Sequence, residues 1–311
     1  MIRCHTVPKF YLKFFVPNGQ KCFWIYDKKG LAVRPQTPDN TLVIGDYYVS
    51  DPDEQGKKNA ETEKALAVLE SDVKPILEEW IARPAQPLNK QKDMQKVAGF
   101  LSLMYTRVPA SVQLVSDMHL WAANFVREKF KESNEDHQLY IKKTGRQVSY
   151  EEYCKFLQDT SPEINDEKYM VRKSLSLSYK ILQAMVQKHW QLIHIKHENF
   201  FVTSDAPLTI FVLKNAIAEF GDFSASDGHI LFPLSSKVCL SISKRGIKSS
   251  VVSKVMVEQF NRRTIAMANQ YVISPFKSNR INKCVKEFSY TFGQPRFDKD
   301  DFKSRLEKSL K

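Results

Sequence analysis

A helical block between two strand-forming regions constrains the fold of this 311-residue chain more than any other feature. From about residue 57 to residue 188, apolar residues recur at three- and four-residue spacing, which is typical of amphipathic helices. In the first predicted helix, residues 58–81, one such stripe contains Leu66, Val73, Leu77 and Trp80. The order of segments predicts an α+β fold: a helical block between a small N-terminal β-hairpin region and a C-terminal mixed or antiparallel sheet with helices.

Proline and turn residues give the boundaries of these segments. The helices of the block are predicted over residues 58–81, 89–107, 110–131, 150–158 and 167–188, with a polar loop at 132–148. Strands are predicted over residues 21–26, 41–44, 190–196, 200–203, 208–213, 230–234, 238–243 and 271–274, and later helices over 254–269, 275–286 and 299–310. We expect one domain over residues 1–311, with N-terminal strands in 1–56, the helical block in 57–188, and the second sheet with its helices in 189–311.

The composition limits where such a chain is expected to work. Its five cysteines are odd in number and far apart in sequence, which argues against a disulfide framework and against a zinc knuckle. The apolar N-terminus is broken by Pro8 and contains Lys9 and Lys13, so it does not resemble a signal peptide. No stretch reaches the roughly twenty apolar residues of a membrane span. We therefore expect a cytoplasmic protein without a membrane partner, and the sequence leaves its oligomeric state open.

The net charge of +12 is concentrated in one part of the chain. Residues 237–286 contain eleven Lys or Arg residues and one acid, Glu258, so this stretch alone carries +10. Such a surface attracts polyanions, and it predicts nucleic acid as the partner. The predicted phosphate contacts are Arg107, Lys244, Arg245, Lys248, Arg262 and Arg263. The alternative is an ordinary solvated surface, because scattered lysines are common on any protein.

Two glutamates in the first predicted helix lie at the edge of its apolar stripe. Acids usually occupy the opposite face, and an inward carboxylate is costly unless it is paired or bound to a metal. Glu63 and Glu70 are seven residues apart, which is roughly 10 Å along a helix axis, so sharing one metal requires a bend or a bridging ligand. The pair either lines a buried cleft or forms ion pairs with a neighbouring helix.

Asp205, His5 and Arg107 are the other candidate functional residues. Asp205 follows a predicted strand and precedes Ala206-Pro207, so it is either a base or metal ligand, or the acceptor of a backbone turn. His5 stands in a segment that we expect to be pinned to the core by residues such as Tyr11. It is a ligand, a general acid/base or a buried histidine whose hydrogen bonds are satisfied. Arg107 ends the second helix, where a cation suits the helix dipole or holds a phosphate.

Several common catalytic signatures are absent from the sequence. It contains no GxxxxGK[ST] loop, no GxGxxG at a strand-to-helix turn, no HExxH and no GxSxG. These absences argue against P-loop ATPases, Rossmann dehydrogenases, zincin proteases and α/β-hydrolases.

A series of short motifs resembles the bacterial domain-of-unknown-function family 4238. The opening residues 5–15, HTVPKFYLKFF, resemble the family's H-x-VP-x-x-YL-x-x-F start. The further matching motifs, in order, are Tyr26-Asp27, Glu63 with Leu66 and Glu70, Arg107 before Pro109, residues 201–207, residues 233–235, and Asn261 with Ala268. One departure is Ala206, where the family usually has Asn. The resemblance implies a single-domain intracellular protein and one constellation of His5, Glu63, Glu70, Arg107 and Asp205, but no reaction.

Two functions are consistent with these observations. The first is a metal-dependent nuclease or other phosphodiesterase, as an effector in a stress or phage response. Glu63, Glu70 and Asp205 would bind one or two Mg²⁺ or Mn²⁺ ions, and His5 would be a ligand or an acid/base. The second is a protein that binds nucleic acid or another partner without catalysis, in which the inward acids are structural.

Overall fold

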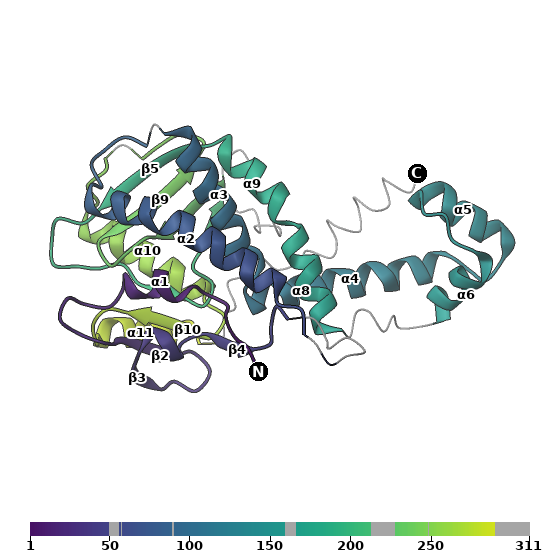
Figure 1. Ribbon diagram of the computed structural model, residues 1–311, viewed down its shortest axis with the longest axis horizontal. Coiled ribbons are helices and arrows are strands. Elements are labelled where there is room, and N and C mark those ends of the chain that lie inside the picture. Colours follow the sequence, from purple (N-terminus) through teal and green to yellow (C-terminus); the bar gives the residue numbers. More distant parts are fainter. Residues whose placement is uncertain are drawn as a thin grey trace.

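The computed structural model describes residues 1–49, 56, 58–88, 90–158, 166–212, 228–247 and 249–289 (Figure 1). It confirms the predicted α+β layout of a helical block between strand-rich N-terminal and C-terminal parts. The helices are α1 (Lys9–Lys13), α2 (Glu61–Ala82), α3 (Gln91–Thr106), α4 (Pro109–Lys129), α5 (Asn134–Thr144), α6 (Tyr150–Gln158), α8 (Glu167–Ser176), α9 (Ser178–Val186), α10 (Lys254–Met267), α11 (Asn279–Glu287) and the 3₁₀ turn η1 (Pro38–Asn40).

The strands of the described residues form three antiparallel sheets. The strands are β1 (Arg3–His5), β2 (Phe23–Asp27), β3 (Val33–Gln36), β4 (Val43–Gly45), β5 (His189–His194), β6 (Thr203–Ser204), β7 (Thr209–Val212), β8 (Gly228–Pro233), β9 (Val238–Ser243) and β10 (Tyr271–Ser274). They are arranged as the pair β1-β4, the central sheet β3-β2-β10-β6 and a second four-stranded sheet β5-β9-β8-β7.

The central sheet joins the two ends of the chain. Strand β10 lies between β2 and β6, with Ile273 opposite both Ile25 and Thr203. The sequence predicted separate N-terminal and C-terminal strand regions, and local patterns contain no signal for this pairing over more than 240 residues of sequence. The pairing places the opening segment of the chain beside residues 203–205.

The two faces of the central sheet contact different groups of helices. Because side chains alternate along a strand, Ile25 and Ile273 share one face and Tyr26 and Val272 share the other. The first face belongs to the main hydrophobic core, together with α1 and residues of α2, α3 and α9. The second face packs against α10 and α11, for example through Ile281. The opening segment is pinned as expected, since the buried hydroxyl of Tyr11 bonds to Thr203 and to the carbonyl of Pro233.

The helical block has a long projection. Figure 1 shows α4 leaving the body of the protein and leading to α5 and α6, which lie far from the sheets. A small separate core of Phe130, Tyr140 and Tyr153 holds this end together. The main body therefore contains the sheets, α2, α3, α9, α10 and α11, and it is the part that positions the candidate site.

Several predicted boundaries differ from the structure. Residues 132–148 were expected to be a loop but contain α5, which Ser133 caps at its start and Gly145 (φ 70°) ends. Its apolar stripe was hard to detect because only two of its residues are buried. The helix predicted over 167–188 is two helices that meet at Leu177, and the five-residue α1 was not predicted because it is too short for a periodic pattern. The helix predicted over 299–310 lies outside the described residues.

The segment between α10 and β10 is held by two buried charged side chains. Lys28 is 2% exposed, and its Nζ donates to the carbonyls of Ile265 (3.0 Å), Ala266 (3.2 Å) and Ala268 (2.8 Å). Asp205 is 7% exposed and accepts the N–H groups of Asn269 (2.9 Å), Gln270 (2.7 Å) and Tyr271 (3.0 Å). We call this arrangement the Lys28–Asp205 clamp. It satisfies the free carbonyls at the end of α10 and the N–H groups that follow them.

The first prediction concerns the lysine of this clamp. Lys28→Met keeps the length of the side chain but leaves three carbonyls without their donor, so we expect a loss of about 2–4 kcal/mol in the free energy of unfolding. Urea unfolding followed by far-UV circular dichroism measures this loss, with the exposed Lys21→Met as a matched control. Equal midpoints for the two variants would contradict a structural role for Lys28.

Candidate functional site

Four of the predicted residues converge between β1, α2 and the junction of α3 with α4. Arg107 is 2% exposed, and its Nη1 donates to Glu70 Oε1 at 2.8 Å. Glu63 lies two helical turns before Glu70 on α2, and it interacts electrostatically with Glu70 and Arg107. His5, on β1, interacts electrostatically with Glu70. We call His5, Glu63, Glu70 and Arg107 the acid–histidine cluster.

His5 carries a neutral ring in this environment. Burial lowers the pKa of His5 below its ordinary value of 6.5, and the nearby cations Arg3 and Lys9 lower it further. A hydrogen bond to the Pro38 backbone and the charge of Glu70 oppose this shift without reversing it. A neutral imidazole can accept a proton, so His5 has the protonation state of a general base at neutral pH.

Glu63 has the opposite character. Burial raises the pKa of Glu63 above its ordinary value of 4.5, and the negative charge of Glu70 raises it further. Arg107 and a hydrogen bond with Cys4 lower it, but their effect is smaller. The thiol of Cys4, which lies beside Glu63, also has its pKa raised by burial. Glu63 therefore keeps its proton to a higher pH than a solvated glutamate, as a general acid requires.

Three buried polar atoms at the cluster have no hydrogen-bond partner among the described residues. They are His5 Nε2, Arg107 Nε and the hydroxyl of Ser111, which lies one helical turn after Arg107. The backbone of Arg107 is nevertheless well held, since Tyr48 donates its hydroxyl to the Arg107 carbonyl at 3.3 Å. Buried polar groups are almost always bonded, so unpaired ones indicate a place where a water or a ligand is accommodated.

Asp205 does not join this cluster. Both of its carboxylate oxygens accept backbone N–H groups in the Lys28–Asp205 clamp. Burial raises the pKa of Asp205, against the N–H donors and Lys28, which lower it. Asp205 therefore accepts hydrogen bonds from the backbone, which is the second of the two roles predicted for it. The N–H donors belong to residues 269–271 and not to the turn that contains Asp205.

The structure does not bring the three predicted metal ligands together. In the parts of the chain that the structure describes, no group of three or more His, Cys, Asp or Glu side chains has a metal-binding arrangement. Glu70 is held by Arg107 and the oxygens of Asp205 are occupied, so Glu63 is the predicted ligand with fewest competing partners.

A cavity of about 330 Å³ is lined by residues that are close in sequence to two members of the cluster. Thr6, which follows His5, lines one wall, and Pro109, two residues after Arg107, lines another. Asp205 also lines this cavity, whereas His5, Glu63, Glu70 and Arg107 are not among its lining residues. The remaining lining residues are Ile25, Arg34, Gln36, Asn40, Thr41, Leu42, Val43, Ile44, Ala110, Asn269, Gln270 and Tyr271.

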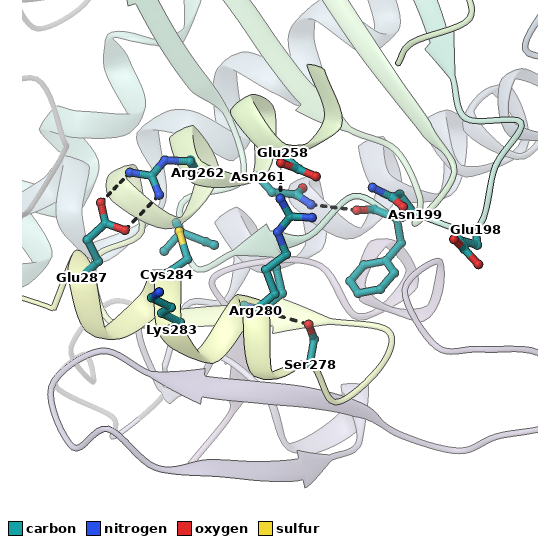
Figure 2. Close-up of a pocket in the computed structure, with 13 residues that line it drawn as sticks. Glu198, Asn199, Glu258, Asn261, Arg262, Ser278, Arg280, Lys283, Cys284 and Glu287 are labelled. Atoms are coloured by element: carbon teal, nitrogen blue, oxygen red, sulfur yellow. Dashed lines mark hydrogen bonds and ion pairs between the residues drawn. The ribbon is translucent and has the colours of Figure 1, made fainter. Parts of the chain in front are cut away.

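The basic C-terminal stretch contains ion pairs that its sequence did not suggest. Figure 2 shows a larger cavity, about 670 Å³, between α10 and α11, with charged side chains that bridge the two helices. Arg262 donates to both oxygens of Glu287, at 2.9 and 2.5 Å, and Arg280 pairs with Glu258. Asn261 has a structural role, bonding to the backbone of Phe200 and Val202. Arg262, a predicted phosphate contact, is therefore already occupied by an acid.

The other predicted phosphate contacts have different surroundings. Lys244 and Arg245 are exposed in the turn after β9 and form no ion pair with any described residue. Arg263 is exposed on α10. Arg107 is buried, and Lys248 lies outside the described residues. Lys244 and Arg245 are thus the members of the predicted set that are exposed without an ion pair to a described residue.

Comparison with known protein families assigns the chain to a family. The model of a protein family of unknown function, DUF4238, matches residues 3–278. The chain belongs to this family. The match spans the acid–histidine cluster, the Lys28–Asp205 clamp and all of α10, so the resemblance of the short motifs is confirmed.

Other comparisons add no activity. No curated protein and no solved structure matches the chain. Within the described residues, no helix combines the length and the apolar character needed to cross a bilayer.

Three residues of the site were not predicted from the sequence. They are the lone thiol Cys4, the loop aromatic Tyr48 and the turn residue Lys28. No local sequence pattern predicts that these side chains are buried. Their roles depend on contacts with residues far away in the chain, such as Lys28 with α10. A single sequence contains no signal for such contacts.

The second prediction uses the raised pKa of Glu63. Because the folded-state pKa is above 4.5, the stability from this carboxyl is complete below pH 4.5 and is lost as the pH rises through the folded-state pKa. Glu63→Gln removes the titration, so the variant should equal or exceed the wild type in stability at neutral pH but not in acid. Urea unfolding across this pH range tests the sign, with the exposed Glu61→Gln as control. Lower stability of Glu63→Gln at neutral pH would instead identify Glu63 as a structural ion-pair partner.

Proposed function

We propose that this protein hydrolyses phosphodiester bonds in nucleic acid, and that the acid–histidine cluster is its catalytic centre. The observation that carries the proposal is the opposite perturbation of two groups that both interact with Glu70: the pKa of His5 is lowered and the pKa of Glu63 is raised. Buried titratable groups with shifted pKa values are concentrated at sites of acid/base catalysis.

The proposed roles follow from these protonation states. His5 accepts a proton from the attacking water, whose oxygen forms the new bond to phosphorus. Glu63 gives its proton to the oxygen that leaves as the phosphorus–oxygen bond breaks. Glu70 and Arg107 position the two reacting groups, because the 2.8 Å ion pair fixes the charge that both of them experience.

The charge of the chain supports nucleic acid as the substrate. The net charge of +12 increases encounter with polyanions, and Lys244 and Arg245 are exposed in the turn after β9. These residues would contact phosphates away from the cluster, without selecting a sequence.

A divalent metal is a separate part of the proposal. Mg²⁺ or Mn²⁺ would activate the attacking water and neutralise the leaving oxygen. The described side chains do not fit this group as they stand, because Asp205 and Glu70 are committed to other partners and only Glu63 and His5 remain. The steps given above therefore use only side chains of the protein.

The third prediction is cleavage. Purified protein is incubated with end-labelled single-stranded RNA, single-stranded DNA and their duplexes, and the products are separated on gels. We expect His5→Gln and Glu63→Gln to reduce the rate by about 10²-fold or more, and Glu61→Gln, on the same helix, to leave it unchanged. The rate should pass through a maximum with pH, because it falls in acid as His5 gains a proton and falls at higher pH as Glu63 loses its proton. Parallel reactions with Mg²⁺, Mn²⁺ or EDTA test the metal.

Two results would contradict this function. One is the absence of cleavage for every substrate and metal condition. The other is cleavage that persists in both His5→Gln and Glu63→Gln at the wild-type rate. Rates that EDTA leaves unchanged would remove the metal from the proposal.

A second candidate function is binding of nucleic acid without cleavage. The observation that favours it is that Glu70 and Asp205 are paired with protein groups, as structural acids are. In this case the cluster stabilises the fold, and the exposed cations carry the function.

The fourth prediction tests this candidate through its salt dependence. Removing two phosphate contacts by Lys244→Gln with Arg245→Gln should weaken binding and lower the slope of log affinity against log salt concentration by about 1–2. Fluorescence anisotropy with a labelled oligonucleotide measures both, with the exposed Lys64→Gln and Lys180→Gln pair as a charge-matched control. Equal slopes for the two double variants would exclude this surface as the nucleic-acid contact.

A further inference from the structure

The cavity of about 330 Å³ that Thr6, Asp205 and Pro109 line has a floor and walls of distinct chemistry. Its floor is one face of the central sheet. The register pairs Arg34 with Ile25 and Gln36 with Phe23, so Arg34, Ile25 and Gln36 share that face. Tyr271 extends the same face on β10, opposite Asp27. The walls come from the β1-β4 pair, η1 and the start of α4.

The polar side chains of this cavity are mainly amides. Gln36, Asn40, Asn269 and Gln270 each present both a donor and an acceptor. Some of this capacity is in use, since the Gln36 amide donates to the Asn40 carbonyl and Gln270 bonds to Asp27. The side-chain amide of Asn269 makes no hydrogen bond within the described part of the chain. Amides of this kind match the edge of a heterocycle that also carries donors and acceptors.

The charge of the cavity favours an anion. Arg34 and Asp205 are its ionisable lining residues of opposite sign. The carboxylate of Asp205 is already neutralised by three N–H donors and by the neighbouring Lys28. The guanidinium of Arg34 forms no ion pair with a described residue, so one cationic group remains to bind a negative ligand. A guanidinium matches the two oxygens of a phosphate.

The size of the cavity restricts the ligand further. Ligand sites commonly enclose about 300–1,000 Å³, so this one takes a single small unit rather than a chain of them. Leu42, Val43 and Pro109 supply apolar walls, and the ring of Tyr271 offers a surface on which a flat ring can stack. A simple anion would leave the apolar walls and amides unused, and a lipid chain would leave the amides unpaired.

We propose that this cavity binds one nucleoside monophosphate unit, with its phosphate at Arg34 and its base against the amides of Gln36, Asn269 and Gln270. The inference rests on the proposed function in one respect: the unit would be the nucleotide next to the bond that is cut. Thr6 and Pro109 line the cavity and are close in sequence to His5 and Arg107, so the bond that is cut would lie toward this wall. The same chemistry is offered by a free mononucleotide and by a nucleotide within a strand.

The test is calorimetric titration of the full chain, carried out with His5→Gln so that no ligand is cut. The ligands are the four ribonucleoside 5′-monophosphates, the corresponding nucleosides, inorganic phosphate and a short single-stranded RNA. We expect at least one mononucleotide to bind more tightly than its nucleoside and than phosphate. Arg34→Gln should weaken that binding about tenfold or more. Ala110→Leu, which fills the cavity from the start of α4, should abolish it.

Matched controls separate local effects from loss of fold. Lys64→Gln removes an exposed cation from α2, and Ala67→Leu enlarges an exposed alanine of the same helix. Both should bind as the parent does, and the melting temperature of every variant is measured. Binding only to the RNA strand, with the same dependence on Arg34 and Ala110, supports the inference with a strand as the source of the nucleotide.

Three results would overturn the inference. They are no binding of any ligand up to millimolar concentration, binding that neither Arg34→Gln nor Ala110→Leu reduces, and phosphate binding as tight as that of the best mononucleotide. Failure of the proposed function is distinguishable from these results. If the wild type cuts no substrate while Arg34-dependent nucleotide binding persists, hydrolysis is wrong and the nucleotide site stands.

Discussion

The fold depends on the insertion of β10 between β2 and β6, and the Lys28–Asp205 clamp makes that insertion favourable. The backbone that connects α10 to β10 turns sharply inside the protein, where unpaired carbonyl and N–H groups are costly. Lys28 supplies donors to three carbonyls, and Asp205 accepts three N–H groups. The two side chains are far apart in the sequence, and both bond to residues 265–271, so they meet only when these three segments are folded together. The clamp therefore couples the N-terminal strands to the C-terminal ones, and Thr6 and Asp205 line the same cavity.

Local features of the sequence were sufficient to predict the class of fold and most of the elements. Helix α6 and strands β9 and β10 have the predicted boundaries, because each has a clear pattern and a cap or turn at its ends. Pairing between distant strands was not predicted, since β2 and β10 carry no mark that specifies each other. The site residues also divide into those with a local sequence signal and those without one.

Glu63 and Glu70 were identified because their position at the edge of an apolar stripe is a local anomaly. Neither the partner of Glu70 nor the use of Asp205 as a backbone acceptor is visible without the fold.

The basic stretch shows how charge along the sequence can differ from charge in space. Residues 237–286 contain a single acid, but Glu287 directly follows the stretch and pairs with Arg262 one helix away. Glu258, inside the stretch, pairs with Arg280, and Glu198, before it, lies within 3.4 Å of Lys254. Such exposed pairs contribute little to stability, yet they reduce the field that a polyanion would meet between α10 and α11. The positive charge available for binding is accordingly shifted toward the turn after β9, where Lys244 and Arg245 are exposed.

The cluster lowers the free energy of unfolding, because charged and polar groups are removed from water without full pairing. Two carboxylates, a neutral histidine and a guanidinium lie close together, yet His5 Nε2 and Arg107 Nε have no partner in the described structure. A hydrophobic set of similar volume would avoid the desolvation cost of these groups. Asp205, by contrast, has every oxygen satisfied and needs no function beyond the clamp. Asp205 is thus a fully paired acid, whereas His5 and Glu63 have shifted pKa values and His5 has an unpaired ring nitrogen. This contrast is the physical reason to place the chemistry at His5 and Glu63 rather than at Asp205.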